Sequence, residues 1–245
     1  MDDQFLRTQM LLGANAMERL QKSHVAVFGL GGVGSYAVEA LVRSGVGELT
    51  LIDDDSVSRT NLNRQLEALH STVGQNKTDA LAARCRDINP GIVLHTICAR
   101  YDAAHREDFF TARYDYIIDA IDTVSSKLDL IETAQARSIP ILCAMGTGNK
   151  TDPTKLCITD LSKTVNCSLA RVMRKELRER GIKHLRVVYS PELPAKPQAL
   201  EAPPPGRRSV PASLVWVPGC AGLMMAGEVI LTLAGYEKGK EGGSK

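Results

Sequence analysis

The chain has 245 residues, which is long enough for a large buried core and ordinary for one α/β domain. Its 30 lysines and arginines nearly balance its 28 aspartates and glutamates, so no overall positive surplus indicates a nucleic-acid-binding protein. The first residues lack the basic and apolar regions of a signal peptide, and we expect no apolar run of the roughly 18 residues that span a bilayer, which predicts a cytoplasmic protein with no membrane partner.

The amino-terminal part of the chain predicts a βαβ unit preceded by two short helices. Residues 5–21 have apolar side chains at helical spacing, interrupted by a glycine. An apolar strand follows at 24–28, then a glycine-rich turn at 29–35, a helix over about 33–44 and a second apolar strand that ends at Asp53. A strand, a glycine turn, a helix and a strand closing on an acid are typical of nucleotide-binding units.

Strands continue to alternate with helices after a polar loop over residues 56–74. We expect helices at 76–88, 103–110 and 125–137, and strands at 92–99, 116–120 and 141–145. This alternation predicts an α/β fold with a Rossmann-like, doubly wound and mainly parallel sheet. Loops at the carboxyl edge of such a sheet form its ligand sites.

The carboxyl-terminal part is less regular. We expect a strand at 156–159, a basic helix at 168–180, a strand at 186–189 and a final apolar helix that begins after Pro218-Gly219. Between these, the proline-rich segment 190–212 has no aromatic residue, which predicts a mobile loop. We expect one domain over 1–245, with a nucleotide-binding core over about 22–150 and a substrate or dimer extension over about 151–236.

The glycine turn and the acid after the second strand are the first candidate ligand-binding residues. Gly29, Gly31, Gly32 and Gly34 precede a helix whose free N–H groups favour a phosphate, and Ser35 adds a hydroxyl. Asp53 lies at the spacing from which an acid accepts hydrogen bonds from ribose hydroxyls. Alone, this pattern is shared by dehydrogenases, methyltransferases and adenylating enzymes.

Further polar residues favour a triphosphate over a dinucleotide. Arg64 and Lys77 supply fixed cations for a reaction that moves charge between phosphate oxygens, and Asn61 and Gln65 are placed to orient the same phosphates. Asp119 and Asp122 follow another strand, and a carboxylate there suits Mg²⁺, which proteins hold through one or two acids together with phosphate oxygens.

Four motifs together resemble the adenylation core of the ubiquitin-activating, ThiF/MoeB-type superfamily: Gly29–Ser35, Asp53-Asp54-Asp55 leading to Asn61–Gln65, Gly74–Lys77, and Asp119–Asp122. The resemblance implies that Asp53 binds the ATP ribose beside Asp55, that Asn61, Arg64 and Lys77 bind phosphates, and that Asp122 rather than Asp119 binds Mg²⁺. It also implies a homodimer in which Arg7 reaches the ATP of the neighbouring subunit.

The carboxyl-terminal part, from Met145 through Cys167–Leu177 to Val188-Tyr189-Ser190, is similar to the tRNA threonylcarbamoyladenosine dehydratases of this superfamily. The resemblance implies ATP-dependent activation of the threonyl carboxylate of threonylcarbamoyladenosine next to the anticodon, followed by cyclisation with loss of water. The modified base carries its own attacking carbamoyl group, so no protein nucleophile is needed. A cysteine desulfurase or sulfur acceptor is a further implied partner.

The six cysteines, none in a Cys-x-x-Cys pair, predict neither disulfides nor a structural zinc site. Cys167 and Cys220 are interpreted as small buried residues. The missing pairs also separate the chain from many sulfur-carrier activators, although an adenylyltransferase for the terminal glycine of a sulfur-carrier protein remains the main alternative. A nicotinamide-dependent oxidoreductase, based on the glycine turn and Asp53 alone, is a third.

One local basic concentration offers a surface for tRNA phosphates, and its alternative is an ordinary solvated helix face. It comprises Arg171, Arg174, Lys175, Arg178, Arg180, Lys183, His184 and Arg186, with Arg207-Arg208 in the proline-rich segment.

Overall fold

The computed structural model describes residues 3–198, 200 and 210–236. Its centre is a seven-stranded sheet in the order β3-β2-β1-β4-β5-β7-β6, parallel except for β6, which runs antiparallel to β7. The strands are β1 His24–Phe28, β2 Glu48–Ile52, β3 Val93–Ile97, β4 Tyr116–Asp119, β5 Ile141–Ala144, β6 Cys157–Asp160 and β7 Arg186–Tyr189. The predicted doubly wound, mainly parallel α/β fold is therefore confirmed.

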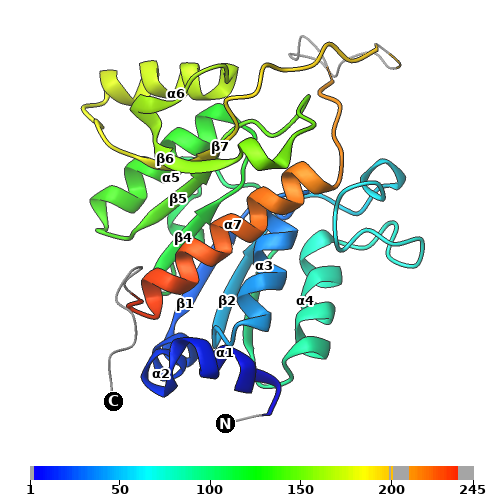
Figure 1. Ribbon diagram of the computed structural model, residues 1–245, viewed down its shortest axis with the longest axis vertical. Coiled ribbons are helices and arrows are strands. Elements are labelled where there is room, and N and C mark those ends of the chain that lie inside the picture. Colours follow the sequence, from blue (N-terminus) through cyan, green and yellow to red (C-terminus); the bar gives the residue numbers. More distant parts are fainter. Residues whose placement is uncertain (1–2, 199, 201–209, 237–245) are drawn as a thin grey trace.

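Helices cover both faces of this sheet. They are α1 Leu6–Leu12, α2 Ala14–Lys22, α3 Gly34–Arg43, α4 Lys77–Ile88, α5 Val124–Ala136, α6 Ser168–Glu179 and α7 Trp216–Leu233. In Figure 1, α3, α4 and α7 lie in front of the strands and α5 lies behind them. The helix predicted at 103–110 is a short 3-10 helix, η3 Arg106–Phe109. Four more 3-10 helices are η1 Asp3–Phe5, η2 Arg59–Asn61, η4 Pro153–Lys155 and η5 Leu161–Lys163.

The core follows from the two-residue period of the strands. Val25 and Val27 in β1 pack with α3 and α7 on one face, whereas Ala26 and Phe28 pack with α5 and η3 on the other. Residues Val25 to Phe28 are apolar on both faces because β1 lies inside the sheet, with a paired strand on each side. The strand ends that face solvent are consequently the places where polar residues gather.

Two expectations about the last helix were wrong. It begins at Trp216, before Pro218, because the first turn of a helix has no intrahelical acceptor for its N–H groups and so tolerates proline. It is also 18 residues long with a mean hydropathy of 1.5, enough by length and composition to cross a bilayer. Half of it is buried, and it packs along α3 (Figure 1), which identifies it as a core helix.

Candidate active site

A cleft of about 780 Å³ opens at the carboxyl edge of the sheet, where the chain order reverses between β1 and β4. It contains most of the residues that the sequence predicted. Those that line it are Gly29, Gly31, Gly32, Asp53, Asp55, Asn61, Arg64, Gln65, Lys77 and Asp122. Two predicted residues, Gly34 and Arg7, are not among the lining residues.

The glycine turn at the cleft floor is shaped by backbone contacts that leave no room for side chains. Gly29 has a φ of 88°, and a Cβ there would lie 2.8 Å from the backbone carbon of Ala120. A Cβ on Gly34 would lie 1.8 Å from the carbonyl oxygen of Gly29. Gly34 therefore packs against the first glycine of the turn, and the residues just before α3 that line the cleft are Gly31, Gly32 and Val33. Free N–H groups at the start of a helix favour an anion there.

Asp53 fixes the position of this turn. One of its carboxylate oxygens accepts a hydrogen bond from the Leu30 N–H at 2.7 Å, and the other accepts one from the Asp55 N–H at 2.9 Å. Burial raises the pKa of Asp53, although the ammonium of Lys77 and these two N–H groups oppose that rise. The acid thus joins the ends of β1 and β2 at the point where both meet the cleft.

Lys77 is a buried cation at the start of α4. Its Nζ lies 2.6 Å from Asp55 Oδ2 and 3.6 Å from Asp53 Oδ1, and the residue is 4% exposed. Burial alone would lower its pKa, but the two carboxylates outweigh burial and raise the pKa. The ammonium is therefore charged at neutral pH and held in place, as a phosphate-binding cation must be.

The segment from Asn61 to Gln65 forms a second wall. The Asn61 side-chain oxygen accepts a hydrogen bond from the Ser58 N–H at 3.0 Å, which leaves its amide NH₂ as the group that can donate to a ligand. Arg64 is half-buried, and its guanidinium is held by the Thr60 carbonyl at 2.8 Å. Gln65 is 8% exposed, and its Oε1 has no hydrogen-bond partner within the described protein. A buried polar atom without a partner at a cleft wall is typical of a ligand site.

Ser35 does not have the expected phosphate-facing position. It is fully buried, and its Oγ accepts a hydrogen bond from the Leu66 N–H at 3.2 Å. The hydroxyl therefore supports the Asn61–Gln65 wall from behind.

The structure separates the two candidate magnesium ligands. Asp119 is fully buried in an ion pair with Lys127, with Oδ2 and Nζ 2.6 Å apart and no exposed side-chain surface on either residue. Asp122, three residues later, lines the cleft. Carboxylates of Asp53, Asp54 and Asp55 also cluster within 4.8 Å, but Lys77 is already bonded to two of them.

Glu67, which the sequence analysis did not identify, lies beside this site. It is 2% exposed, and neither carboxylate oxygen has a hydrogen-bond partner among the described residues. Burial raises the pKa of Glu67 to about 7, against the attraction of the Lys77 ammonium. A glutamate in a polar stretch offers no sequence signal of burial, so only the fold reveals it.

Glu67→Gln is expected to stabilise the protein at pH 8 by up to about 3 kcal/mol and to change its stability little at pH 4. As pH rises from about 4.5 to 7, the unfolded chain loses the Glu67 proton before the folded chain does, so this group progressively destabilises the fold. Urea denaturation at the two pH values measures the difference. The exposed Glu18→Gln on α2 is the control, and an equal effect of both variants would contradict the prediction.

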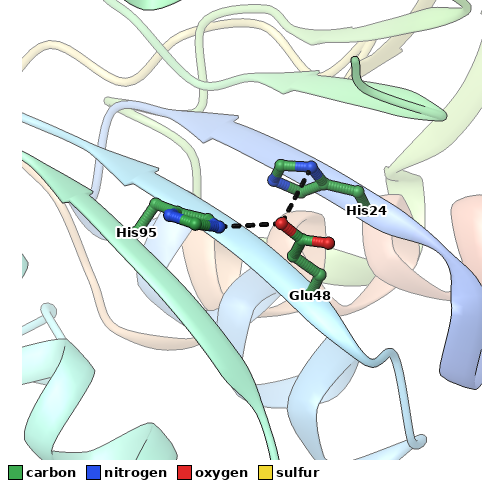
Figure 2. A group of neighbouring side chains, drawn as sticks. All are labelled: His24, Glu48 and His95. Carbon is green, nitrogen blue, oxygen red and sulfur yellow. Dashed lines mark hydrogen bonds and ion pairs between the residues drawn. The ribbon is translucent and has the colours of Figure 1, made fainter. Parts of the chain in front are cut away.

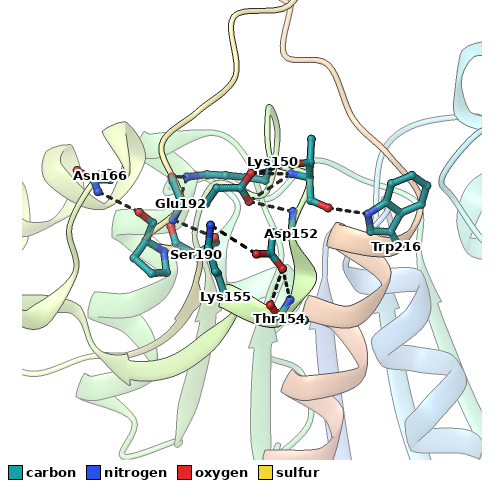
Figure 3. Close-up of polar contacts among 10 residues, drawn as sticks. Lys150, Asp152, Thr154, Lys155, Asn166, Ser190, Glu192 and Trp216 are labelled. Carbon is teal, nitrogen blue, oxygen red and sulfur yellow. Dashed lines mark hydrogen bonds and ion pairs between the residues drawn. The ribbon is translucent and has the colours of Figure 1, made fainter.

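The opposite wall comes from the carboxyl-terminal part of the chain, namely residues 144–150, 166–169, 194, 211, 213 and 218. Figure 3 shows how it is tied together: the Glu192 carboxylate accepts hydrogen bonds from Thr151 N–H at 3.0 Å and Asp152 N–H at 3.1 Å. Trp216 Nε1 donates to the Thr151 carbonyl at 2.9 Å, and the Lys150 ammonium binds the carbonyls of Ser190 and Glu192.

Asn149 links the described residues near both ends of the proline-rich segment to this wall. Its carbonyl accepts a hydrogen bond from Ala195 N–H at 2.8 Å, and its side-chain oxygen accepts one from Ala212 N–H at 2.8 Å. The predicted mobile loop at 190–212 is therefore anchored at both flanks. Its residues 199 and 201–209 lie outside the described part of the chain.

The predicted basic surface, which extends from α6 to the start of β7, is only partly available to a ligand. Arg174 donates to the Thr164 carbonyl at 2.7 Å, Arg180 pairs with Glu176 at 2.9 Å, and Arg186 pairs with Glu228. These three cations are engaged within the protein. Exposed members of the predicted set on this helix include Arg171, Lys175 and Arg178, whereas Arg207-Arg208 lie outside the described residues.

The remaining residues that the sequence singled out are Arg7 and the cysteines. Arg7 is exposed on α1, which lies at the end of the molecule away from the loops of the cleft in Figure 1. All six cysteines are unpaired, as expected. Cys167 is buried at the cleft wall, where its Sγ accepts from the Ala170 N–H and caps α6, whereas Cys220 in α7 is half-buried.

Comparison with known proteins gives consistent matches over almost the whole chain. Residues 5–243 match the ThiF family. A tRNA threonylcarbamoyladenosine dehydratase of Bacillus subtilis is 44% identical over 246 residues, and the alignment covers 94% of each chain. Crystal structures of the E. coli tRNA N6-threonylcarbamoyladenosine dehydratase are 32% identical. The complex with ATP gives a TM-score of 0.83 over 95% of both chains, and the complex with AMP gives 0.84 over 96% of both.

Proposed function

This chain belongs to the ThiF family, and we propose that it is a tRNA threonylcarbamoyladenosine dehydratase. It uses ATP to cyclise threonylcarbamoyladenosine in tRNA. The observation that carries this assignment is the cleft at the carboxyl edge, where the glycine turn, an acid and two cations meet. The similarity to dehydratases extends through both walls of that cleft, because it covers 94% of the chain.

The residues of the cleft divide into those that bind the nucleoside and those that bind phosphates. Asp53, at the end of β2, accepts from the ribose hydroxyls, while the N–H groups of Gly31 and Gly32 face the phosphates. Lys77 and Arg64 neutralise the charge that develops on the phosphate oxygens, with the Asn61 and Gln65 amides orienting them. The support is that all seven line one cleft.

A carboxylate is a poor electrophile, so it must first be converted to an acyl-adenylate, which carries a good leaving group. The threonyl carboxylate attacks the α-phosphorus of ATP, the bond to the β-phosphate breaks, and pyrophosphate leaves. The carbamoyl group of the same modified base then attacks the activated carbonyl carbon and loses one N–H proton to solvent. The bond from that carbon to the phosphate-bound oxygen breaks, and AMP leaves with one carboxylate oxygen. Because both reacting groups belong to one nucleoside, the protein needs only to hold it in place and exclude water.

Release of AMP and pyrophosphate that depends on tRNA carrying threonylcarbamoyladenosine tests this assignment. With ¹⁸O in the threonyl carboxylate, one label is expected in the phosphate of AMP. Release of ADP, or turnover that is indifferent to the modified tRNA, would contradict it. A small protein ending in Gly-Gly, added in place of tRNA, tests the sulfur-carrier alternative, which no observation in the structure favours.

Asp122 is the residue we propose for Mg²⁺. It follows β4 at the cleft, and carboxylate oxygens are the ligands that Mg²⁺ prefers. When bound, the ion would offset the charge of the triphosphate.

Dehydration transfers no sulfur, so a cysteine desulfurase is proposed only as a partner outside the reaction. The exposed cations of α6, which starts at the cleft wall, are proposed to contact tRNA phosphates.

A homodimer is proposed from the surface around Arg7. Met10 and Leu11 on the same helix are 86% and 74% exposed, which is unusual for large apolar side chains unless a partner covers them. Arg7 would then act in the partner's cleft.

A mixture of two inactive variants is expected to regain activity if Arg7 acts across subunits. In a mixed dimer of Arg7→Ala and Arg64→Ala, one cleft has its own Arg64 and the Arg7 of the other subunit. AMP formation by the co-refolded mixture is the measurement, and each variant alone is the control. No recovery in a mixture shown to contain mixed dimers would contradict the prediction.

A further inference from the structure

Three adjacent strands bring two histidines and a glutamate together, away from the carboxyl edge of the sheet where the cleft lies. His24 begins β1 and Glu48 begins β2, at paired positions, while His95 in β3 is paired with Thr50. Paired and next-but-one residues share a face of the sheet, so the three side chains meet there (Figure 2). His24 lies at the opposite end of β1 from the glycine turn, ~13 Å along the strand.

The three side chains converge on one point. His95 Nε2 lies 2.7 Å from Glu48 Oε1, and His24 Nδ1 lies 3.4 Å from the same oxygen. One donor atom from each residue lies within 4.8 Å of the others. Two imidazole nitrogens and a carboxylate oxygen that face a common point form a donor set suited to a borderline divalent metal.

The ring of His24 is also held in a fixed orientation. The residue is 5% exposed, its Nε2 lies 2.8 Å from Thr50 Oγ1, and its ring packs edge-on against Tyr114. An imidazole whose far nitrogen is fixed by a hydroxyl resembles the outer-shell arrangement of metal-binding histidines.

We propose that His24 Nδ1, Glu48 and His95 Nε2 form a Zn²⁺ site, with water as the fourth ligand. Zinc bonds of about 2.0–2.2 Å would place neighbouring ligand atoms about 3.3 Å apart, so side-chain rotations alone accommodate the ion. The Glu48 and His95 side chains are 36% and 49% exposed, which gives the ion a path from solvent.

The site would serve the fold rather than the dehydration. β3 is an edge strand whose side chains are mostly exposed, and the ion would join it to β2 and β1. The sequence predicted no zinc site because none of its six cysteines lies in a Cys-x-x-Cys pair. These ligands lie 24 and 47 residues apart along the chain, and only the parallel register aligns them.

Titration of the metal-free protein with Zn²⁺ by calorimetry tests the site, with excess Mg²⁺ present to occupy the carboxylates of the cleft. One equivalent is expected to bind, with a zinc-dependent rise in melting temperature. His95→Ala and Glu48→Gln are each expected to weaken binding by about tenfold or more and to abolish that rise. Co²⁺ in place of Zn²⁺ is expected to give the visible spectrum of a four-coordinate site.

The matched control is His105→Ala. His105 makes a similar imidazole–carboxylate contact, with Nδ1 3.0 Å from Asp102 Oδ1, but it belongs to no described group of three donors. Zinc affinity is expected to be unchanged in this variant. Equal zinc affinity in His95→Ala, Glu48→Gln and the unmodified protein would overturn the proposal, whatever the outcome of the tRNA assay. Because both substituted side chains are partly exposed, the variants are expected to fold, and melting without zinc checks this.

Discussion

Arg64→Ala is expected to lower the rate of AMP formation from ATP and modified tRNA by about 10²- to 10³-fold without changing the melting temperature. Arg64 lines the cleft and is half-buried, but its guanidinium donates hydrogen bonds only to the exposed residues Thr60 and Asn63, so its removal leaves no buried group without a partner. Phosphoryl transfer depends on cations that are already in position when charge moves onto the leaving pyrophosphate. Lys77→Ala is expected to lose the same activity, with some loss of stability because Asp53 and Asp55 lose their partner.

The control for this prediction is Arg59→Ala. Arg59 is an exposed arginine five residues earlier on the same segment, and it is not among the residues that line the cleft. A radiolabelled-ATP assay of AMP release compares the two variants. Unchanged turnover of Arg64→Ala, or equal losses in both variants, would remove Arg64 from the site.

The sequence predicted the elements of the fold well because each has a strong local signal. β1, β2, β4 and β5 are short, largely apolar runs, and each has a glycine or an acid at its last residue or within the next two, at the edge where ligands bind. The start of α7 was misplaced because Pro218 was interpreted as a boundary, although proline is compatible with a first turn. Motif spacing also predicted ten residues of the cleft, because motif residues follow strands that end at one edge.

What the sequence could not predict depends on contacts between distant segments. Nothing in the Asn61–Gln65 stretch indicates that Glu67 is buried, and nothing near Ser35 indicates that its hydroxyl supports Leu66. The His24, Glu48 and His95 group requires the pairing of three strands. Arg174 resembles a tRNA-binding cation in sequence, yet the fold holds it against the Thr164 carbonyl.

Asp119 and Asp122 illustrate the same limit, since both follow an apolar strand and only one lines the cleft. Asp119 is the last residue of β4, and Lys127 in the first turns of α5 reaches back to it. A lysine near the amino end of a helix is opposed by the helix dipole, so the carboxylate compensates for its position. The other Asp119 oxygen accepts from the Ile121 N–H at 3.1 Å and so shapes the loop that carries Asp122.

Lys127→Met is therefore expected to destabilise the fold by about 3–5 kcal/mol, because it leaves the fully buried Asp119 carboxylate without its counter-charge. Urea denaturation measures the loss. Lys175→Met, which removes an exposed lysine 4.0 Å from Glu179, is the control and should have a much smaller effect. An equally small loss for Lys127→Met would show that the pair contributes little.

The double variant Lys127→Met with Asp119→Asn separates the charge from the hydrogen bond. The neutral amide keeps an oxygen that can accept from Ile121 N–H, so most of the lost stability is expected to return. If the loop after β4 positions Asp122 through that hydrogen bond, Lys127→Met alone should raise the Mg²⁺ concentration required for AMP formation. The double variant should restore the requirement of the unmodified protein. Recovered stability with a persistently raised Mg²⁺ requirement would instead show that the Asp119 charge itself contributes to the metal site.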